Sequence, residues 1–328
     1  MKKLFTLEEL EQATELVHSV VLPTPQIVWP KLAARAGCQV WAKHENHTPT
    51  GAFKVRGGLT YMDELLRSGA GARGVISATR GNHGQSIALA AARTSIPATI
   101  YVPRGNSPDQ NASMRAFGAN VVEFGEDFDQ ARVEAARVAA ERELHFVPSF
   151  HVALVKGVAS SALELFRAVT DLHAAYVPIG MGSGICGMIA TRDLLGLPTE
   201  IIGVVTEKAP AMALSFAAGK PVATATAKTF ADGMATRDPQ PHAVEMILRG
   251  ASRIVQVTED EIAEAMRIHF DDAHQVVEGA GAASLAALLK ERHRHAGKKV
   301  AIIVSGGNIE RARYERVLNG ATPVVPAG

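Results

Sequence analysis

The sequence predicts an α/β protein made of two doubly wound parallel-sheet domains. From residue 74 onward, short β-branched segments (GVISAT, ATIYVP and NVVEFG) alternate with longer Ala-rich segments. A strand followed by a helix, repeated in this way, is typical of a parallel sheet. The alternation continues through AYVPIG, EIIGVVTE and KKVAIIVSGG, which is more strands than one modest sheet carries. We therefore expect a small domain over residues 48–148 and a large domain formed by residues 1–47 and 149–328.

The first strand that the sequence predicts is QVWAKHE, which leads into the small domain. Helices are then expected to begin at about Asn82, Pro108 and Asp127, each directly after a predicted strand. No repeat at solenoid spacing, low-complexity segment or Pro-rich linker interrupts the sequence. We therefore expect the two domains to pack closely around a shared cleft.

Composition and charge favour a small-molecule enzyme of the cytoplasm. The 328 residues are 47% hydrophobic, and 34 basic residues nearly cancel 33 acidic ones, so no surface for nucleic acid or membrane is indicated. No apolar segment approaches the roughly 20 residues that span a bilayer. The two cysteines, Cys38 and Cys186, are far apart and form neither a disulfide framework nor a metal-ligand pattern, which fits a reducing compartment.

Four unusual loops follow four predicted strands: HTPTGAFKVRGG, TRGNHG, GMGSGICG and SGGN. Loops at the carboxyl ends of parallel strands meet at one crevice. Each loop also has a simpler interpretation as a turn or a helix cap. Because four such loops share one edge, the sequence predicts a single site built from distant segments.

The glycine-rich loop GMGSG is suited to binding an anion. Gly180, Gly182 and Gly184 leave consecutive backbone N–H groups open at the start of a helix, where a phosphate can bind. A tight turn without a ligand is the simpler alternative. A dinucleotide, and hence a dehydrogenase, is another, but Glu207 comes too late in the sequence for the usual ribose contact.

Lys54 is the candidate nucleophile. It follows Phe53 at the expected start of a helix, with Arg56 two residues later. A helix N-terminus and a guanidinium both disfavour a protonated amine, and this condition favours a lysine that forms a Schiff base. The alternative is a solvated surface lysine.

Asn82 and His83 stand where another helix is expected to begin, and the first turn of that helix offers N–H groups to a carboxylate. The alternative for Asn82 is a plain helix cap. Ser305, in SGGN, is a further candidate, with a turn residue at the end of a strand as its alternative.

Taken together and in this order, these loops and the segment FADGMA resemble the fold-type II pyridoxal-phosphate (PLP) enzymes, in their serine/threonine dehydratase and serine racemase branch. The resemblance extends over nearly the whole chain, and Ala52 stands where that family usually has serine. It implies a PLP site in the cleft between the two domains. Lys54 is then the Schiff-base lysine and general base, and Phe53 and Gly233 pack on the two faces of the ring.

The resemblance also assigns the remaining contacts. Asn82 contacts the phenolic oxygen of the ring, and Ser305 faces the pyridine nitrogen. The substrate carboxylate lies among Thr79, Asn82 and His83. The phosphate is held by the loop residues Gly180, Met181, Gly182, Ser183 and Gly184.

The implied activity is that of a dehydratase (ammonia-lyase), which converts a β-hydroxy-α-amino acid such as threonine or serine to a 2-oxo acid and ammonia by α,β-elimination. A neutral hydroxyl at Ser305 leaves the ring nitrogen largely unprotonated, which suits rapid loss of a β-leaving group. Dehydratases specific for 3-hydroxyaspartate or 3-phenylserine, and the dehydratase of hydroxyectoine breakdown, are alternatives. A racemase and a non-catalytic PLP or amino-acid binding protein are others; Lys54 argues against the last.

Three residues depart from the family pattern or leave it open. Arg80 stands where racemases carry an acid–base serine, which disfavours racemisation because arginine stays charged. Arg80 is instead suited to a second substrate carboxylate or to a structural salt bridge. Glu207 matches a cation ligand of some relatives, but the second ligand position is Ala213, so binding of a divalent or monovalent cation is open. Glu278 resembles a glutamate near the cofactor, with a cap of the following helix as the alternative.

The resemblance also bears on the assembly and the control of the protein. The family commonly forms homodimers or homotetramers, and we expect the same here. The sequence ends at Gly328, soon after SGGN, so we expect neither a C-terminal regulatory domain nor control by isoleucine.

Overall fold

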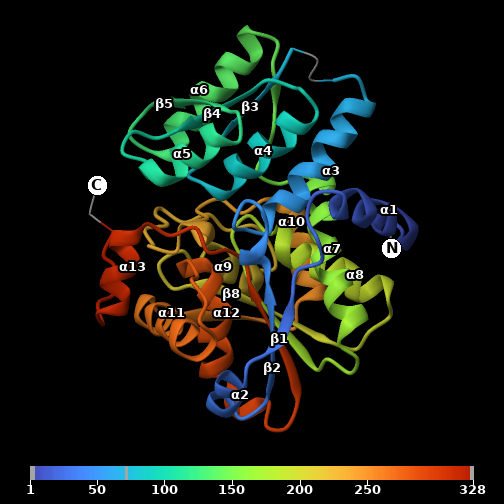
Figure 1. Ribbon diagram of the computed structural model, residues 1–328, viewed down its shortest axis with the longest axis vertical. Helices are drawn as coiled ribbons and strands as arrows, with labels where there is room; N and C mark the ends of the chain where they lie inside the picture. Colours follow the sequence, from blue (N-terminus) through green and yellow to red (C-terminus); the bar gives the residue numbers. More distant parts are fainter. Residues whose placement is uncertain (1–3, 71–72, 326–328) are drawn as a thin grey trace.

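The computed structural model describes residues 4–70 and 73–325, and within these ranges it contains two separate sheets (Figure 1). The smaller sheet lies in the upper part of Figure 1 and the larger one in the lower part. The smaller sheet has the order β5 (Asn120–Glu123), β4 (Ala98–Val102), β3 (Val75–Ala78), β6 (His145–Phe146). The larger sheet has the order β1 (Gln26–Val28), β2 (Gln39–His44), β10 (Lys299–Val304), β7 (Ala174–Pro178), β8 (Glu200–Thr206), β9 (Arg253–Val257).

All strand pairs of the smaller sheet are parallel, as the sequence predicts. The helices that follow its strands begin where they were expected: α4 at Asn82, α5 at Pro108, and α6 directly after Asp127, whose side chain caps it. Alternate residues of β3 face opposite layers, because Val75 packs in the cluster with α3 and α4, whereas Ile76 packs in the cluster with α6. The smaller sheet is therefore covered on both faces.

The larger sheet is parallel except for β1, which pairs antiparallel with β2. Neither β1 nor β9 was predicted. The three residues of β1 are too few to show a period, and β9 (RIVQV) places a charged and a polar side chain within a β-branched segment. Helices cover both faces of this sheet, since α12 packs with α2 and α11, whereas α8 packs with α7 and α10.

Thirteen α-helices and three short 3₁₀ segments are formed by the described residues. The helices are α1 (Leu7–His18), α2 (Pro30–Ala36), α3 (Lys54–Arg67), α4 (Asn82–Arg93), α5 (Pro108–Ala116), α6 (Phe128–Glu141), α7 (Val152–Ala168), α8 (Ser183–Leu194), α9 (Ala211–Ala218), α10 (Pro241–Gly250), α11 (Glu259–Ala273), α12 (Gly279–Lys290) and α13 (Arg311–Leu318). The 3₁₀ segments are η1 (Glu45–His47), η2 (Asp232–Met234) and η3 (Arg292–Arg294). Across residues 4–70 and 73–325, no helix combines the length and apolarity needed to cross a membrane.

The two predicted doubly wound parallel units are thus confirmed as the fold class. Strands β3 to β6, which form the smaller sheet, lie between residues 75 and 146. Helices α3 and α7, which flank the smaller sheet in sequence, pack against each other. No break in packing within the described residues therefore marks the predicted domain boundaries near residues 48 and 148, and these stay a prediction.

Candidate active site

The loop that carries Lys54 is tied directly to the loop after β10. Ala52 forms an isolated antiparallel bridge with Gly306. The backbone N–H of Phe53 donates to the oxygen of Ser305 at 3.1 Å, and that of Gly307 donates to Gly51 at 2.9 Å. Two of the four loops that the sequence singled out therefore meet through backbone hydrogen bonds.

Lys54 is the first residue of α3, and its Nζ lies 4.6 Å from the centroid of the Phe53 ring. Nζ makes no hydrogen bond or ion pair with any residue that the structure describes. Burial lowers the pKa of Lys54, and the negative charge of Glu278 opposes this shift. Partial burial without a hydrogen-bond partner thus favours the neutral amine, which is the form that a nucleophile or proton acceptor needs.

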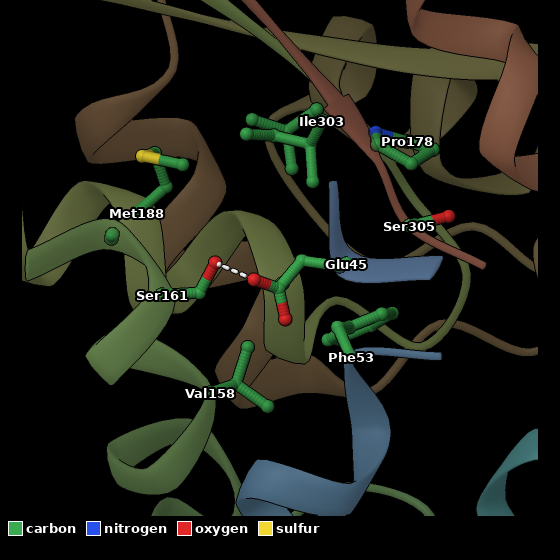
Figure 2. A pocket seen from close by; sticks show the side chains of 11 residues that line it. Glu45, Phe53, Val158, Ser161, Pro178, Met188, Ile303 and Ser305 are labelled. Atoms are coloured by element: carbon green, nitrogen blue, oxygen red, sulfur yellow. Dashed lines mark hydrogen bonds between the residues drawn. The ribbon is translucent and has the colours of Figure 1, made fainter. Parts of the chain in front are cut away.

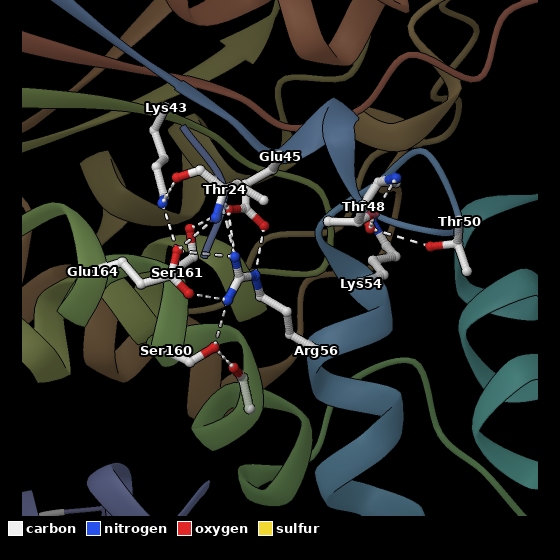
Figure 3. A network of polar contacts seen from close by, with 12 residues as sticks. Thr24, Lys43, Glu45, Thr48, Thr50, Lys54, Arg56, Ser160, Ser161 and Glu164 are labelled. Carbon is white, nitrogen blue, oxygen red and sulfur yellow. Dashed lines mark hydrogen bonds and ion pairs between the residues drawn. The ribbon is translucent and has the colours of Figure 1, made fainter. Parts of the chain in front are cut away.

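Arg56 does not act on Lys54 in the way that the sequence suggested. Its buried guanidinium lies on the other side of the chain from the Lys54 amine, where it donates to Glu45 at 2.7 Å and to Glu164 at 2.5 Å (Figure 3). Lys43 donates to the same Glu164 at 2.5 Å. Two cations and two carboxylates thus neutralise one another in the interior. The pKa of Lys54 is lowered as predicted, but by burial and not by Arg56. The guanidinium of Arg56 binds Glu45 and Glu164 instead.

These four side chains, Lys43, Glu45, Arg56 and Glu164, form what we call the buried charge cluster. It joins β2 and η1 to α7 and to the first turn of α3. Because Arg56 lies two residues after Lys54, the cluster anchors the helical turn that presents the amine. Buried charges of this kind are tolerated when every carboxylate and cation is paired.

Phe53 lines a small cavity of about 20 Å³, which is room for one water molecule (Figure 2). Ser305 and Glu45 also line this cavity. The ring packs against Gly184, where an added Cβ would lie 3.6 Å from the ring carbons. Phe53, Gly184 and Ser305, predicted from three separate loops, therefore share one wall.

The glycine loop, residues 180–184, connects β7 to α8. Gly182 is the N-cap of α8 and has a φ of 103°, which L side chains rarely adopt. The loop packs tightly on η2, because a Cβ on Gly180 would lie 2.2 Å from the oxygen of Gly233. Met181 Sδ lies 3.6 Å from Oγ1 of Thr236. The open first turn of α8, beginning at Ser183, thus faces the segment that carries Gly233 and can bind an anion.

Asn82 and Glu278 meet across the two sheets. Asn82 Nδ2 donates to both carboxylate oxygens of Glu278, at 2.8 and 3.1 Å. The capping alternative for Asn82 was wrong, because Gly81 is the N-cap of α4. Glu278 is the N-cap of α12, as its alternative proposed, although its side chain makes no capping hydrogen bond there. Burial raises the pKa of Glu278 to about 7, although the Asn82 hydrogen bond and the charge of Lys54 lower it.

Thr79, Arg80 and His83 surround the start of α4. Thr79 is buried, and its Oγ1 accepts from the N–H of Gly81 at 3.1 Å. His83 is also buried, and burial together with the nearby charge of Lys54 lowers its pKa to about 4. Its Nε2 has no hydrogen-bond partner among the described residues. The imidazole is therefore neutral at physiological pH.

Arg80 is exposed, and the structure shows no ion pair or hydrogen bond of its side chain in the described part of the chain, so the salt-bridge alternative gains no support. Burial raises the pKa of Asp232 above its usual value, and the positive charges of Arg313 and Arg80 partly oppose this shift. Asp232 also accepts from Arg313 at 3.1 Å. Arg80 therefore lies near Asp232, the neighbour of Gly233, with its guanidinium available to a ligand.

Glu207 follows β8 and is exposed. Within residues 4–70 and 73–325, no group of three or more His, Cys, Asp or Glu side chains is arranged to hold a metal ion. Glu207 therefore belongs to no such group, and its role as a cation ligand stays a prediction.

Sequence reasoning missed two residues that contact the predicted site. Asn308 donates from Nδ2 to Oδ1 of Asn82 at 2.8 Å, and Gln110 donates to the backbone oxygen of Asn308 at 3.2 Å. Asn308 is the last residue of the SGGN motif, so its place in that loop could have indicated a role in the site. No sequence pattern pointed to Gln110, because its contact with Asn308 depends on how α5 packs against the loop after β10.

Comparisons with known proteins agree with this geometry. Residues 17–306 match the model of a family described as pyridoxal-phosphate dependent enzyme. The chain is 34% identical to the L-threonine ammonia-lyase of Thermotoga maritima, over 96% of this chain and 79% of that protein. It is 32% identical to an L-threo-3-hydroxyaspartate ammonia-lyase of a Pseudomonas species, over 97% and 100%.

Among solved structures, the processed form of threonine deaminase isoform 2 from Solanum lycopersicum superposes with a TM-score of 0.89 at 29% identity, covering 97% of this chain and 95% of that one. The family match covers most of the chain, including the first three loops described above and Ser305 and Gly306 of the fourth. The chain therefore belongs to the family of pyridoxal-phosphate dependent enzymes.

Proposed function

We propose that this protein is a PLP-dependent dehydratase, an ammonia-lyase that converts a β-hydroxy-α-amino acid to a 2-oxo acid and ammonia. The observation that carries the proposal is the unpartnered, partly buried amine of Lys54. It lies over the ring of Phe53 and within electrostatic reach of the Glu278 carboxylate, to which the Asn82 amide donates. Relatives named as threonine and hydroxyaspartate ammonia-lyases support the reaction class.

The residues present fit PLP. Lys54 supplies an amine without a competing hydrogen bond, and the first turn of α8 supplies open N–H groups for a phosphate. Close packing of Gly180 on Gly233 leaves no room there for a side chain, so backbone alone forms that part of the wall. We assign Lys54 to hold the cofactor, Phe53 and Gly233 to its ring faces, and Ser305 to its pyridine nitrogen.

PLP, when bound, withdraws electrons from the α-carbon of an amino acid. Lys54 moves the α-proton, and the burial that lowers its pKa increases the fraction of amine able to accept it. The N–H groups at the start of α4, with Thr79 and neutral His83, hold the substrate carboxylate. Loss of the α-proton and the β-hydroxyl leaves an enamine, which tautomerises and hydrolyses to the 2-oxo acid and ammonia.

We further propose that Arg80 favours a substrate with an acidic group on Cβ, as in 3-hydroxyaspartate. Its guanidinium is exposed at the start of α4 without an ion-pair partner among the described residues, and it can bind a carboxylate through two N–H groups. Threonine and serine share the reacting atoms and are the second candidates, favoured by the threonine ammonia-lyase relatives.

A racemase is the second activity to consider. Racemisation needs an acid–base group on the face of the substrate opposite Lys54, and a permanently charged arginine at position 80 does not provide one. A protein that only binds PLP or an amino acid would not need the unpartnered amine of Lys54. Both alternatives are therefore less consistent with the site than elimination.

The experiment is a measurement of 2-oxo acid release by the PLP-loaded protein with five substrates: L-threonine, L-serine, threo- and erythro-3-hydroxyaspartate, and 3-phenylserine. We expect 2-oxo acid from at least one of them, with hydroxyaspartate turned over most efficiently. Efficient turnover of threonine with none of hydroxyaspartate would reject the role of Arg80 but retain the dehydratase. No 2-oxo acid from any of the five would reject the dehydratase.

We also propose that the protein acts in the cytoplasm as a homodimer or homotetramer, with a domain division near residues 48 and 148. The unpaired, buried thiols of Cys38 and Cys186 support a reducing compartment. Sedimentation of the purified protein would establish its assembly.

A further inference from the structure

Asn308 connects three segments around Asn82. Its side-chain Nδ2 donates to the backbone oxygen of Thr50 at 2.7 Å and to Oδ1 of Asn82 at 2.8 Å. Its backbone oxygen accepts from Nε2 of Gln110 at 3.2 Å, and Oε1 of Gln110 accepts from Nε2 of Gln85 at 2.6 Å. We call the four amide side chains, those of Asn82, Gln85, Gln110 and Asn308, the amide relay.

The groups at the ends of the relay determine which way the amide of Asn82 points. The backbone oxygen of Thr50 can only accept, so Nδ2 of Asn308 must face it. The second N–H of that nitrogen then requires an acceptor, so Asn82 must present Oδ1 to Asn308. Asn82 Nδ2 consequently faces the carboxylate of Glu278, which accepts from it. Both carboxylate oxygens of Glu278 accept from this nitrogen, at 2.8 and 3.1 Å, so a cofactor oxygen would compete with one of them for an N–H group of Asn82.

The backbone around the relay is shaped to admit it. A Cβ on Gly51 would lie 2.6 Å from Oδ1 of Asn308, and a Cβ on Gly81 would lie 2.7 Å from Oε1 of Gln110. Real Cβ atoms do not come this close to other heavy atoms, so any side chain at either position would displace a relay amide. Gly51 adjoins the Lys54 segment and Gly81 precedes Asn82, so the close approaches occur beside the site itself.

We propose that Asn308, supported by Gln110, is a positioning residue that holds Asn82 with its amide N–H groups toward the phenolic oxygen of the cofactor and toward Glu278. The inference rests on the proposed contact of Asn82 with that oxygen. Asn308 follows β10 of the larger sheet, whereas Asn82 and Gln110 lie in helices that follow strands of the smaller sheet. The relay therefore fixes a cofactor contact across the two halves of the molecule.

The test is titration of the cofactor-free protein with PLP, followed by absorbance, for wild type, Asn82→Ala and Asn308→Asp. An aspartate at 308 has nearly the same size but no N–H to donate. We expect the Kd for PLP to rise about tenfold, because the hydrogen bond that orients Asn82 and the one that anchors Asn308 to Thr50 are both lost. The absorbance maximum of the bound cofactor should shift in the same direction as in Asn82→Ala.

The matched control is Asn120→Asp, the same chemical change on the exposed residue that begins strand β5. It should leave the Kd and the absorbance maximum unchanged. Asn308→Asp with the affinity and spectrum of wild type would overturn the proposal. If Asn308→Asp does not fold, as judged by circular dichroism, Gln110→Ala removes only the outer support, and it should give a smaller change in the same direction. No change in Gln110→Ala would then overturn the proposal.

A double-mutant cycle shows whether Asn308 acts through Asn82. Asn308→Asp should add nothing to Asn82→Ala, because a residue that orients Asn82 has no effect once that amide is gone. If the effects of the two substitutions on the Kd are additive, the amide relay is overturned but the role of Asn82 is not. If Asn82→Ala has the spectrum and affinity of wild type, both the role of Asn82 and the amide relay are overturned. Neither readout needs turnover, so a protein that binds PLP but releases no 2-oxo acid would contradict only the proposed function.

Discussion

The side-chain amide of Asn82 donates to both carboxylate oxygens of Glu278, at 2.8 and 3.1 Å, although the two residues belong to helical segments packed on different sheets. Asn82 begins the helix after β3 of the smaller sheet, and Glu278 precedes α12, which covers the larger sheet. This contact joins the two halves of the molecule at the candidate site. It also places a carboxyl with a pKa of about 7 close to Lys54, so the protonation of Glu278 and of Lys54 is linked.

Glu278 should make the stability of the cofactor-free protein depend on pH. Its pKa is raised from 4.5 to about 7 in the folded state, so between these values the folded protein binds more protons than the unfolded chain. The resulting stabilisation is present below pH 4.5 and is lost as the pH rises through 7. We therefore expect the Tm of wild type to fall relative to that of Glu278→Gln between about pH 5 and about pH 8.

Thermal unfolding of the two proteins across this range measures the effect. The exposed residue Glu141 offers a matched control, since Glu141→Gln should keep a constant Tm difference from wild type. A constant difference for Glu278→Gln as well would contradict the raised pKa.

Replacing Lys54 with Ala should remove both cofactor attachment and proton transfer. We expect loss of the absorbance band of lysine-bound PLP and a fall in turnover of about a thousandfold or more, because no other described amine lies beside Phe53. Lys220→Ala, at an exposed lysine after α9, should leave both properties unchanged. Near-normal turnover in Lys54→Ala would reject the assigned base.

Replacing Arg80 with Ala should change substrate choice. The kcat/KM for 3-hydroxyaspartate is expected to fall by about 10- to 100-fold, the effect of losing hydrogen bonds to a charged group, while that for threonine changes little. Arg104→Ala, which removes an exposed arginine paired with Glu126, is the control. Equal losses for the two substrates would mean that Arg80 does not contact the group on Cβ.

The buried charge cluster should contribute strongly to stability when it is complete. Arg56→Met leaves Glu45 and Glu164 buried with Lys43 as their remaining cation, and should lower the free energy of unfolding by about 3–5 kcal/mol. Arg137→Met removes an arginine that is also paired with two glutamates but is exposed to solvent, and it should lower the free energy of unfolding far less. Denaturant unfolding measures both, and similar small losses would contradict the importance of burial.

Much of this architecture could be predicted because its determinants are local. The helix starts at Asn82 and Pro108 follow from strand, turn and cap residues that are adjacent in sequence. The site loops could be grouped because parallel strands bring their carboxyl ends together, as the bridge between Ala52 and Gly306 shows.

What could not be predicted depends on contacts between distant segments. The direction of Arg56 is set by Glu45 and Glu164, of which the latter lies 108 residues away. The contact of Gln110 with Asn308 spans 198 residues and depends on how the two halves pack. In each case the side chain has several available partners, and only the fold selects among them.

The most direct test of the central claim is the ratio of 2-oxo acid to ammonia released by the PLP-loaded protein, with enantiomer analysis of the amino acid that remains. Elimination predicts equal amounts of the two products and a remaining substrate without its opposite enantiomer. Accumulation of the opposite enantiomer without 2-oxo acid, or the absence of both products with every β-hydroxy-α-amino acid tested, would contradict it.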